Sequence, residues 1–367
     1  MIVAGRRPGA ILAAAALSAI LATVHVAEAA PINFTFGFAD APGTGFFDPR
    51  FGARAQDTLR AAGDIWGRQF EARYAGETVG VRARFGTPSI AGTIAVGSPI
   101  AIRFDFAGAV PNSQYPAALA NHLLGRDIHT PANPFTPTGD EVGILFSNTT
   151  NWFYGGTGTP GVGQIDFLTV ALHEIGHGLG FTTNIAGDGS FGRLQPSLPA
   201  IYDRFVVDEF GTRVTGLTNE ERLAAVTDAL SLFWAGESAT SANNNTRPVL
   251  ETTEGVYRNG ISVAHLSTGG FDLLGRRDIM MGGSNGGRVI RTPDNITLAV
   301  LQDMGWDIQP TLVVVPEPGT LALVAFGLAG LAAVRSGAWP SPRPSPGGRG
   351  GRVGQVAHLR DSGIQLA

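Results

Sequence analysis

The sequence predicts an α+β fold, with an N-terminal mixed sheet, a helix that carries the motif HEIGH, and a loop-rich C-terminal part. Three observations lead to this prediction. Segments that alternate apolar and polar residues, as half-buried strands do, precede a strongly apolar helical run at 167–180. The chain is 44% apolar and holds 51 glycines, which suits a globular protein with many loops. We expect one domain over 30–310, with subdomains at about 31–181 and 182–310.

The strands are expected in the first subdomain. Segments 79–86 and 100–108 alternate apolar and polar residues, and 142–148 is an apolar run of strand length. The turn-rich stretch that follows contains Trp152, Phe153 and Tyr154, which are expected either to line or cover a cleft or to pack in the core.

Helices are expected where apolar residues recur at helical spacing or where helix-ending residues flank an apolar run. Asp166 can cap the helix over 167–180, and Gly178 and Gly180 can end it. The second subdomain holds two helical patterns separated by loops. The expected helices are 57–75, 116–125, 167–180, 218–236 and 293–304.

The first 29 residues have the pattern of a signal peptide. Arg6 and Arg7 precede an apolar run from Ala10 to Val26, and Ala27-Glu28-Ala29 has the small-x-small form of a signal-peptidase site. The sequence therefore predicts an exported protein.

The composition excludes several functions. Without cysteine, the chain can form neither disulfides nor thiolate metal ligands. Between the two terminal segments, 19 arginines face 27 acidic residues, which argues against a nucleic-acid partner because such proteins need a basic surface.

The segment 315–335 begins Val-Pro-Glu-Pro, continues as a glycine-rich apolar run and ends at Arg335. It resembles the PEP-CTERM sorting signal. That resemblance implies an exosortase-type sorting enzyme as a partner, transient anchoring by a transmembrane helix, and delivery to the periplasm, outer surface or extracellular matrix of a Gram-negative bacterium. Residues 336–367 are rich in proline, glycine and arginine and are expected to form a disordered tail.

The motif HEIGH places two imidazoles and a carboxylate on one helix. A helix turns about 100° per residue, so His173 and His177 lie on one face and can bind a single ion. Glu174 is positioned beside them, where it could take a proton from a water molecule activated by zinc.

Elimination leaves several residues for a third ligand. In zinc peptidases with this helix the third ligand follows the motif, and within the domain His265 is the histidine that does so. Asp188 and Asp203 remain alternatives, although Asp203 lies among aromatic residues that favour a structural hydrogen-bonding role. Thr183 occupies the short-spacing position, but a neutral hydroxyl is a poor zinc ligand.

A histidine far downstream of the helix, followed by "DIMMGG", resembles the leishmanolysin-like metzincins. The resemblance implies a metzincin-like zinc peptidase fold in which His265 is the third ligand of one catalytic Zn²⁺. It also implies that Met280, or else Met281, forms a methionine turn beneath the metal.

We therefore expect a secreted zinc-dependent endopeptidase that acts on protein or peptide substrates, with Glu174 as general base. Strand 142–148 is expected to form the cleft edge and to pair with an extended substrate. The alternative is a non-catalytic surface protein that binds the exopolysaccharide matrix through the same fold. Calcium could bind glycine-rich turns near Asp188 or at 282–287, but such turns are far more common than ion sites.

Overall fold

The structure is a computed structural model that describes residues 30–128, 139–194, 197–269, 277–282 and 289–309. Three predicted segments lie outside the described residues: the signal peptide at 1–29, the apolar sorting helix at 315–335 and the tail at 336–367. Among the described residues, no helix is both long enough and apolar enough to cross a membrane.

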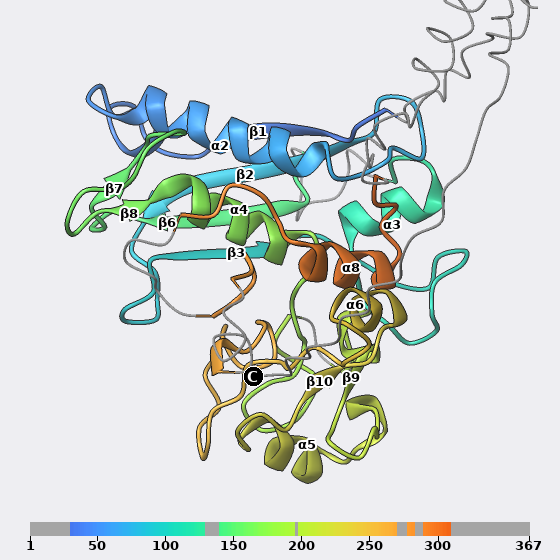
Figure 1. The fold of residues 1–367 in the computed structure, drawn as a ribbon. Coiled ribbons are helices and arrows are strands. Elements are labelled where there is room, and N and C mark those ends of the chain that lie inside the picture. The colour runs from blue at the N-terminus through green and yellow to red at the C-terminus, as the bar shows by residue number, and fades with distance from the viewer. Residues whose placement is uncertain (1–29, 129–138, 195–196, 270–276, 283–288, 310–367) are drawn as a thin grey trace, which may run out of the picture. The chain divides into compact units, whose positions relative to one another are not determined.

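A four-stranded mixed sheet forms the N-terminal half (Figure 1). Its order is β1-β2-β6-β3, in which β1 pairs with β2 and β2 with β6 in parallel, whereas β3 pairs antiparallel with β6. The predicted mixed sheet in an α+β arrangement is therefore present. The strands are β1 (Asn33–Phe38), β2 (Thr78–Gly86), β3 (Ala95–Pro99) and β6 (Val142–Ser147).

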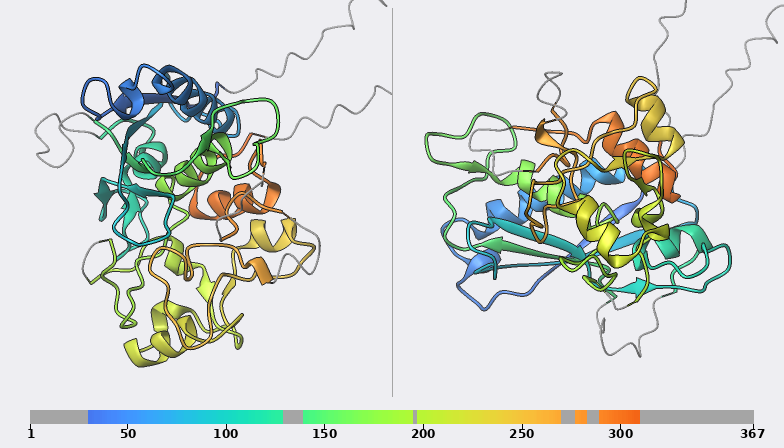
Figure 2. Two further views of the ribbon diagram at one scale, coloured as in Figure 1. Left: turned by 90° about the vertical axis from the view of Figure 1, so that its left-hand side faces the viewer. Right: turned by 90° about the horizontal axis from the view of Figure 1, so that it is seen from below.

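Two helices cover one face of this sheet. Helix α2 (Gly52–Gly67) packs on β1, α4 (Phe167–Gly178) packs on β3 and β6, and the two helices contact each other (Figure 2). On β2 the residues at 79, 81, 83 and 85 are buried, while Arg82 and Arg84 are exposed. This alternation is the period-2 pattern of a half-buried strand.

Several predicted boundaries were wrong. The first helix is α2, at Gly52–Gly67 rather than 57–75, and the helix expected at 218–236 is the shorter α5 (Asn219–Val226). Of the strand expected at 100–108, only β4 (Ile102–Arg103) forms. The extended run stops because Asp105 has a φ of 53° and Gly108 a φ of 86°, and neither value is compatible with a strand.

The expected edge strand was also misplaced. Strand β6 has β2 on one side and β3 on the other, so its backbone groups are already paired and it offers no edge. The edge next to α4 is β3, which the sequence analysis did not predict. Its five residues include Gly97 and Pro99, and apolar and polar residue types do not alternate along it as they do in a readily predicted strand.

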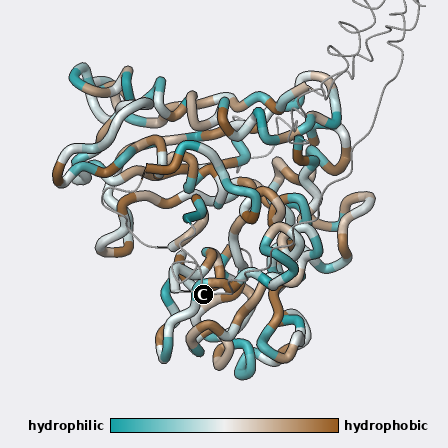
Figure 3. Tube along the Cα trace, viewed as in Figure 1, coloured by the Kyte–Doolittle hydropathy of each residue, from teal (hydrophilic) through white to brown (hydrophobic). Residues whose placement is uncertain are grey.

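The chain after α4 is dominated by loops, as predicted, and short elements separate them. Apolar stretches recur through the sheet and its helices, whereas hydrophilic residues are frequent in the outer turns (Figure 3). The predicted helices at 116–125 and 293–304 are present as α3 (Ala117–Leu124) and α8 (Asn295–Met304). The remaining elements are β5 (Tyr115–Pro116), β7 (Trp152–Phe153), β8 (Ile165–Asp166), β9 (Val206–Val207), β10 (Phe233–Trp234), α6 (Glu237–Ala242) and 3-10 turns at Gly45–Phe47, Tyr202–Arg204 and Val214–Gly216.

Candidate metal centre

Helix α4 begins at the predicted cap. The Asp166 carboxylate accepts a hydrogen bond of 2.7 Å from the Thr169 amide, and it pairs with Arg291 at 2.6 Å. The helix is anchored along its length because the indole of Trp66 donates to the Leu172 carbonyl at 2.9 Å. The HEIGH residues therefore lie on a helix fixed at its start and in its middle.

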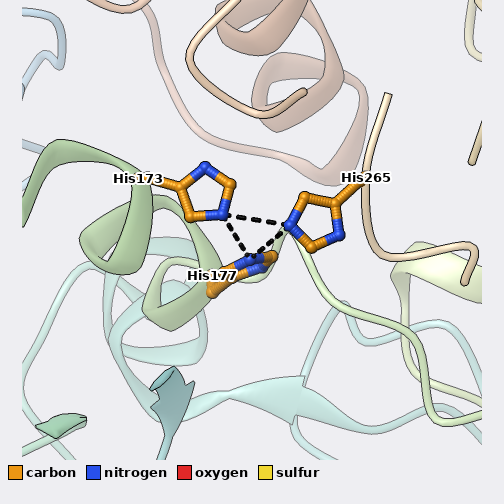
Figure 4. A group of neighbouring side chains, drawn as sticks. All are labelled: His173, His177 and His265. Carbon is orange, nitrogen blue, oxygen red and sulfur yellow. Dashed lines mark hydrogen bonds between the residues drawn. The ribbon is translucent and has the colours of Figure 1, made fainter. Parts of the chain in front are cut away.

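Three imidazoles meet at one point (Figure 4). Two come from α4, and the third comes from a loop, 88 positions after His177. The Nε2 atom of His173 lies 3.0 Å from that of His265 and 3.1 Å from that of His177, and the third separation is 3.2 Å. The structure thus brings together the three histidines that the sequence analysis selected.

The opposite ring nitrogens all face backbone carbonyls. The Nδ1 atom of His173 lies 2.6 Å from the Ile279 oxygen, and that of His177 lies 2.7 Å from the Phe181 oxygen. The Nδ1 atom of His265 lies 3.1 Å from the Ile261 oxygen. A carbonyl oxygen only accepts hydrogen bonds, so each Nδ1 carries a proton, and each neutral ring presents a lone pair at Nε2.

Three converging lone pairs repel one another unless a cation lies between them. At zinc–nitrogen distances of about 2.0–2.1 Å, nitrogens that are about 3.0–3.4 Å apart can share one ion. The observed separations of 3.0, 3.1 and 3.2 Å fit this arrangement. The donor set therefore suits a transition-metal ion, for which imidazole is a preferred ligand.

Burial favours the neutral form of the rings. Desolvation lowers the pKa of His265 to about 3 and lowers that of His177 well below its usual value, and the neighbouring rings act in the same direction. At neutral pH these two side chains are therefore uncharged, as metal ligands must be.

Glu174 is on α4, where this helix packs on the edge strand β3, and 5% of its surface is exposed. Burial raises the pKa of its carboxyl to about 8, while the nearby Gly97 amide acts in the opposite direction. A β-carbon at Gly97 would lie 2.2 Å from the Glu174 carbonyl oxygen, so only glycine permits this close approach. Gly97 thus positions the strand against the motif, a role that the sequence analysis missed.

Met280 packs against α4 at Gly176, which lies between His173 and His177 in the sequence. A β-carbon at Gly176 would lie 2.5 Å from the Met280 sulfur, and Met280 is fully buried. Its amide donates to the buried Asp278 carboxylate at 2.8 Å, and its carbonyl accepts from Leu266, the residue after His265, at 2.9 Å. The predicted turn residue therefore lies close to the histidine cluster.

The alternative ligands lie elsewhere. Asp188 is exposed and accepts hydrogen bonds from the backbone and side chain of Ser190. Asp203 is buried and accepts from the Thr183 hydroxyl and the Asn184 and Ala200 amides, as its aromatic setting suggested. Within the described part of the chain, the three histidines form the sole group able to hold a metal ion. Nothing there favours the calcium hypothesis, and 283–288 lie outside the described residues.

The aromatic run serves a different cavity. Trp152, Phe153 and Tyr154 line a cavity of about 940 Å³ beside the start of α2, and none of the three histidines lines it. Trp152 also packs in the core against Phe167, with ring centroids 5.3 Å apart. The structure therefore favours the core-packing prediction for Trp152 and separates the run from the histidine cluster.

The fold and site together define an α+β protein with a candidate three-histidine metal centre. Residues 116–236, from β5 to β10 and including α4, match the family described as SPBPB7E8-like. Residues 314–336 match the PEP-CTERM protein-sorting motif. Comparison with curated proteins found no match. Comparison with solved structures also found none.

The sorting-motif match confirms the PEP-CTERM prediction made for 315–335. Such motifs are recognised by an exosortase-type sorting enzyme and imply export in Gram-negative bacteria. The protein is therefore an exported protein that carries a sorting signal, and the sorting enzyme is one of its partners.

Proposed function

We propose that the protein is a zinc-dependent endopeptidase of metzincin-like architecture. The observation that carries this proposal is the convergence of three Nε2 atoms within 3.2 Å of one another. Glu174 lies on α4, the helix that carries two of these histidines. A structural zinc site normally has four protein ligands, whereas a catalytic site has three and leaves a position open. The described residues supply three.

His173, His177 and His265 would hold the zinc, which when bound lowers the pKa of water and polarises a peptide carbonyl. Glu174 acts as general base: it takes a proton from the attacking water and delivers it to the leaving amine. Its burial supports this role, because a carboxyl with a raised pKa can both accept and return a proton near neutral pH.

Strand β3 offers an edge on which an extended substrate can lie. At the two ends of the β3–β6 pair, the Ile94 carbonyl accepts from the Ser147 amide and the Ile100 amide donates to the Glu141 carbonyl. Both distances are 2.8 Å. In an antiparallel pair such residues alternate with ones that face away, so the backbone groups of Ala95 and the carbonyls of Gly97 and Pro99 face the free edge, while the Gly97 amide bonds the Glu174 carboxyl. A peptide strand added there would run past Glu174.

Replacing Glu174 tests the proposal. We expect Glu174→Gln to lower kcat for peptide cleavage by about 10²–10⁴-fold, because the amide cannot accept the proton. Zinc content should stay unchanged, since Glu174 is not a ligand. The matched control is Glu220→Gln, an exposed change in the first turn of α5. Zinc binding without chelator-sensitive cleavage in the native protein would instead favour the matrix-binding alternative.

A further inference from the structure

Arg193 joins two segments that are far apart in the sequence. Its Nη1 donates to the Thr182 hydroxyl at 2.9 Å and to the Thr183 carbonyl at 3.1 Å. Its Nε donates to the Asn259 side-chain oxygen at 3.2 Å. One planar guanidinium therefore holds the chain just after α4 against the chain just before His265.

Both segments orient a metal-binding imidazole. Thr182 directly follows Phe181, whose carbonyl accepts from His177 at 2.7 Å. Asn259 precedes Ile261 by two residues, and the Ile261 carbonyl lies 3.1 Å from the Nδ1 of His265. A shift between the two segments would therefore change the separation of the two rings.

We infer that Arg193 is a positioning residue of the metal centre, which sets the spacing between His177 and the remote third ligand. On the other side of the cluster, the segment around Met280 supplies a second tie. There the Ile279 carbonyl faces His173, and the Met280 carbonyl accepts from Leu266 at 2.9 Å. The segment that carries His265 is thus tied at two places: near the carbonyl that orients His177 and near the carbonyl that orients His173.

The geometry of arginine explains why this residue type is used. The tie needs donors in two directions from one rigid plane, which a guanidinium provides and an ammonium group does not. In the described part of the chain, no carboxylate lies within ion-pair distance of Arg193. Its hydrogen bonds are therefore to neutral oxygens.

A positive charge near the histidines also opposes a metal cation, and its proximity is one of the causes that lower the pKa of His177 and His265. Two substitutions separate this repulsion from positioning. Arg193→Gln removes the charge and the fork, while Arg193→Lys keeps the charge and removes the fork. Positioning predicts that both variants lose metal affinity, whereas repulsion predicts that the glutamine variant gains it.

The test measures metal binding on the full chain. Zinc affinity is determined by competition with a chelator, the Co²⁺-loaded protein gives a visible absorption spectrum, and thermal unfolding is followed without metal. The matched control is Arg204→Gln. Arg204 also donates to neutral oxygens, but to those of a single segment, with Nε at 2.8 Å from the Ser113 hydroxyl and Nη2 at 2.6 Å from the Asn112 carbonyl.

We expect both Arg193 variants to bind zinc about 10–100-fold more weakly and to show a changed Co²⁺ spectrum, as loss of an outer-shell partner does. Native affinity and spectrum in either variant, tighter binding by Arg193→Gln, or an equal loss in Arg204→Gln would each overturn the inference. The inference rests on the metal-binding part of the proposed function alone. If the native protein binds zinc but cleaves no peptide, the peptidase proposal fails and this inference stands; if it binds no zinc, both fail.

Discussion

The three imidazoles of the candidate metal centre owe their orientation to backbone carbonyls. His173, His177 and His265 each direct Nδ1 at a carbonyl oxygen, at 2.6, 2.7 and 3.1 Å. These contacts select the tautomer with an unprotonated Nε2 and limit ring rotation. The three lone pairs are therefore arranged by the fold before any ion binds.

Glu141 is another buried carboxyl, directly before β6. Its side chain accepts from the Gly80 amide at 2.5 Å and from Asn121 at 3.0 Å. Burial raises its pKa to about 7 despite these bonds. Because the folded value exceeds the unfolded one, the folded state holds the proton more tightly than the unfolded chain does. Its contribution to stability is complete below pH 4.5 and is lost as the pH rises through about 7.

We therefore expect Glu141→Gln to reduce the pH dependence of stability. Between pH 5 and pH 8, its free energy of unfolding should fall less than that of the native protein, by about 1–3 kcal/mol. Chemical denaturation at the two pH values measures this difference. Glu209→Gln, at an exposed turn, corrects for the loss of one negative charge. An identical pH dependence in Glu141→Gln and the native protein would contradict the expectation.

At the residue level the sequence was informative where chemistry restricts the choice. Few histidines follow the motif, so elimination favoured His265, which the structure brings to the cluster. Arg193 could not be found in this way, because all 26 basic residues are arginine and no motif includes Arg193. Its role depends on contacts between segments that are remote in the sequence.

Among the elements, α4 depends on one buried cap. Asp166 has a fully buried carboxylate that bonds Thr169 and pairs with Arg291, which precedes α8. The cap thus stabilises the start of the motif helix and fixes the late segment that crosses it.

Asp166→Ala should lower the free energy of unfolding by about 1–3 kcal/mol, since it removes the cap and leaves Arg291 without its partner. Equilibrium denaturation measures this loss. The double variant with Arg291→Met separates the two parts, because in the Arg291→Met background the ion pair is absent whether residue 166 is aspartate or alanine. A loss below about 0.5 kcal/mol in Asp166→Ala would show that the cap contributes little.

Prediction of strands succeeded only where burial follows a regular pattern. Strand β2 was predicted almost to the residue because its alternation is the alternation of its two faces. Strand β1 carries the same signal in Phe34, Phe36 and Phe38, which was overlooked. The residues of β3, Ala-Val-Gly-Ser-Pro, do not alternate apolar and polar types, although their burial alternates. Pairing with β6 and contact with α4 determine its conformation more than its own residues do.

In the molecule as a whole, the sheet with its two helices supplies two of the three candidate metal ligands, and the loop-rich part that follows supplies the third. The fold class and the sorting signal could be predicted from local patterns. The mutual placement of His177 and His265 could not, because it depends on ties such as Arg193 and the turn at Met280. Long-range contacts of this kind leave no periodic trace in a single sequence.

The metal content of the purified protein tests the central claim most directly. After zinc loading and dialysis, we expect about one zinc per chain in the native protein and in the control Asp188→Ala, and little in His265→Ala, because two imidazoles alone bind weakly. A native protein that retains no zinc, or a His265→Ala variant that retains as much as the native protein, would contradict the three-histidine centre.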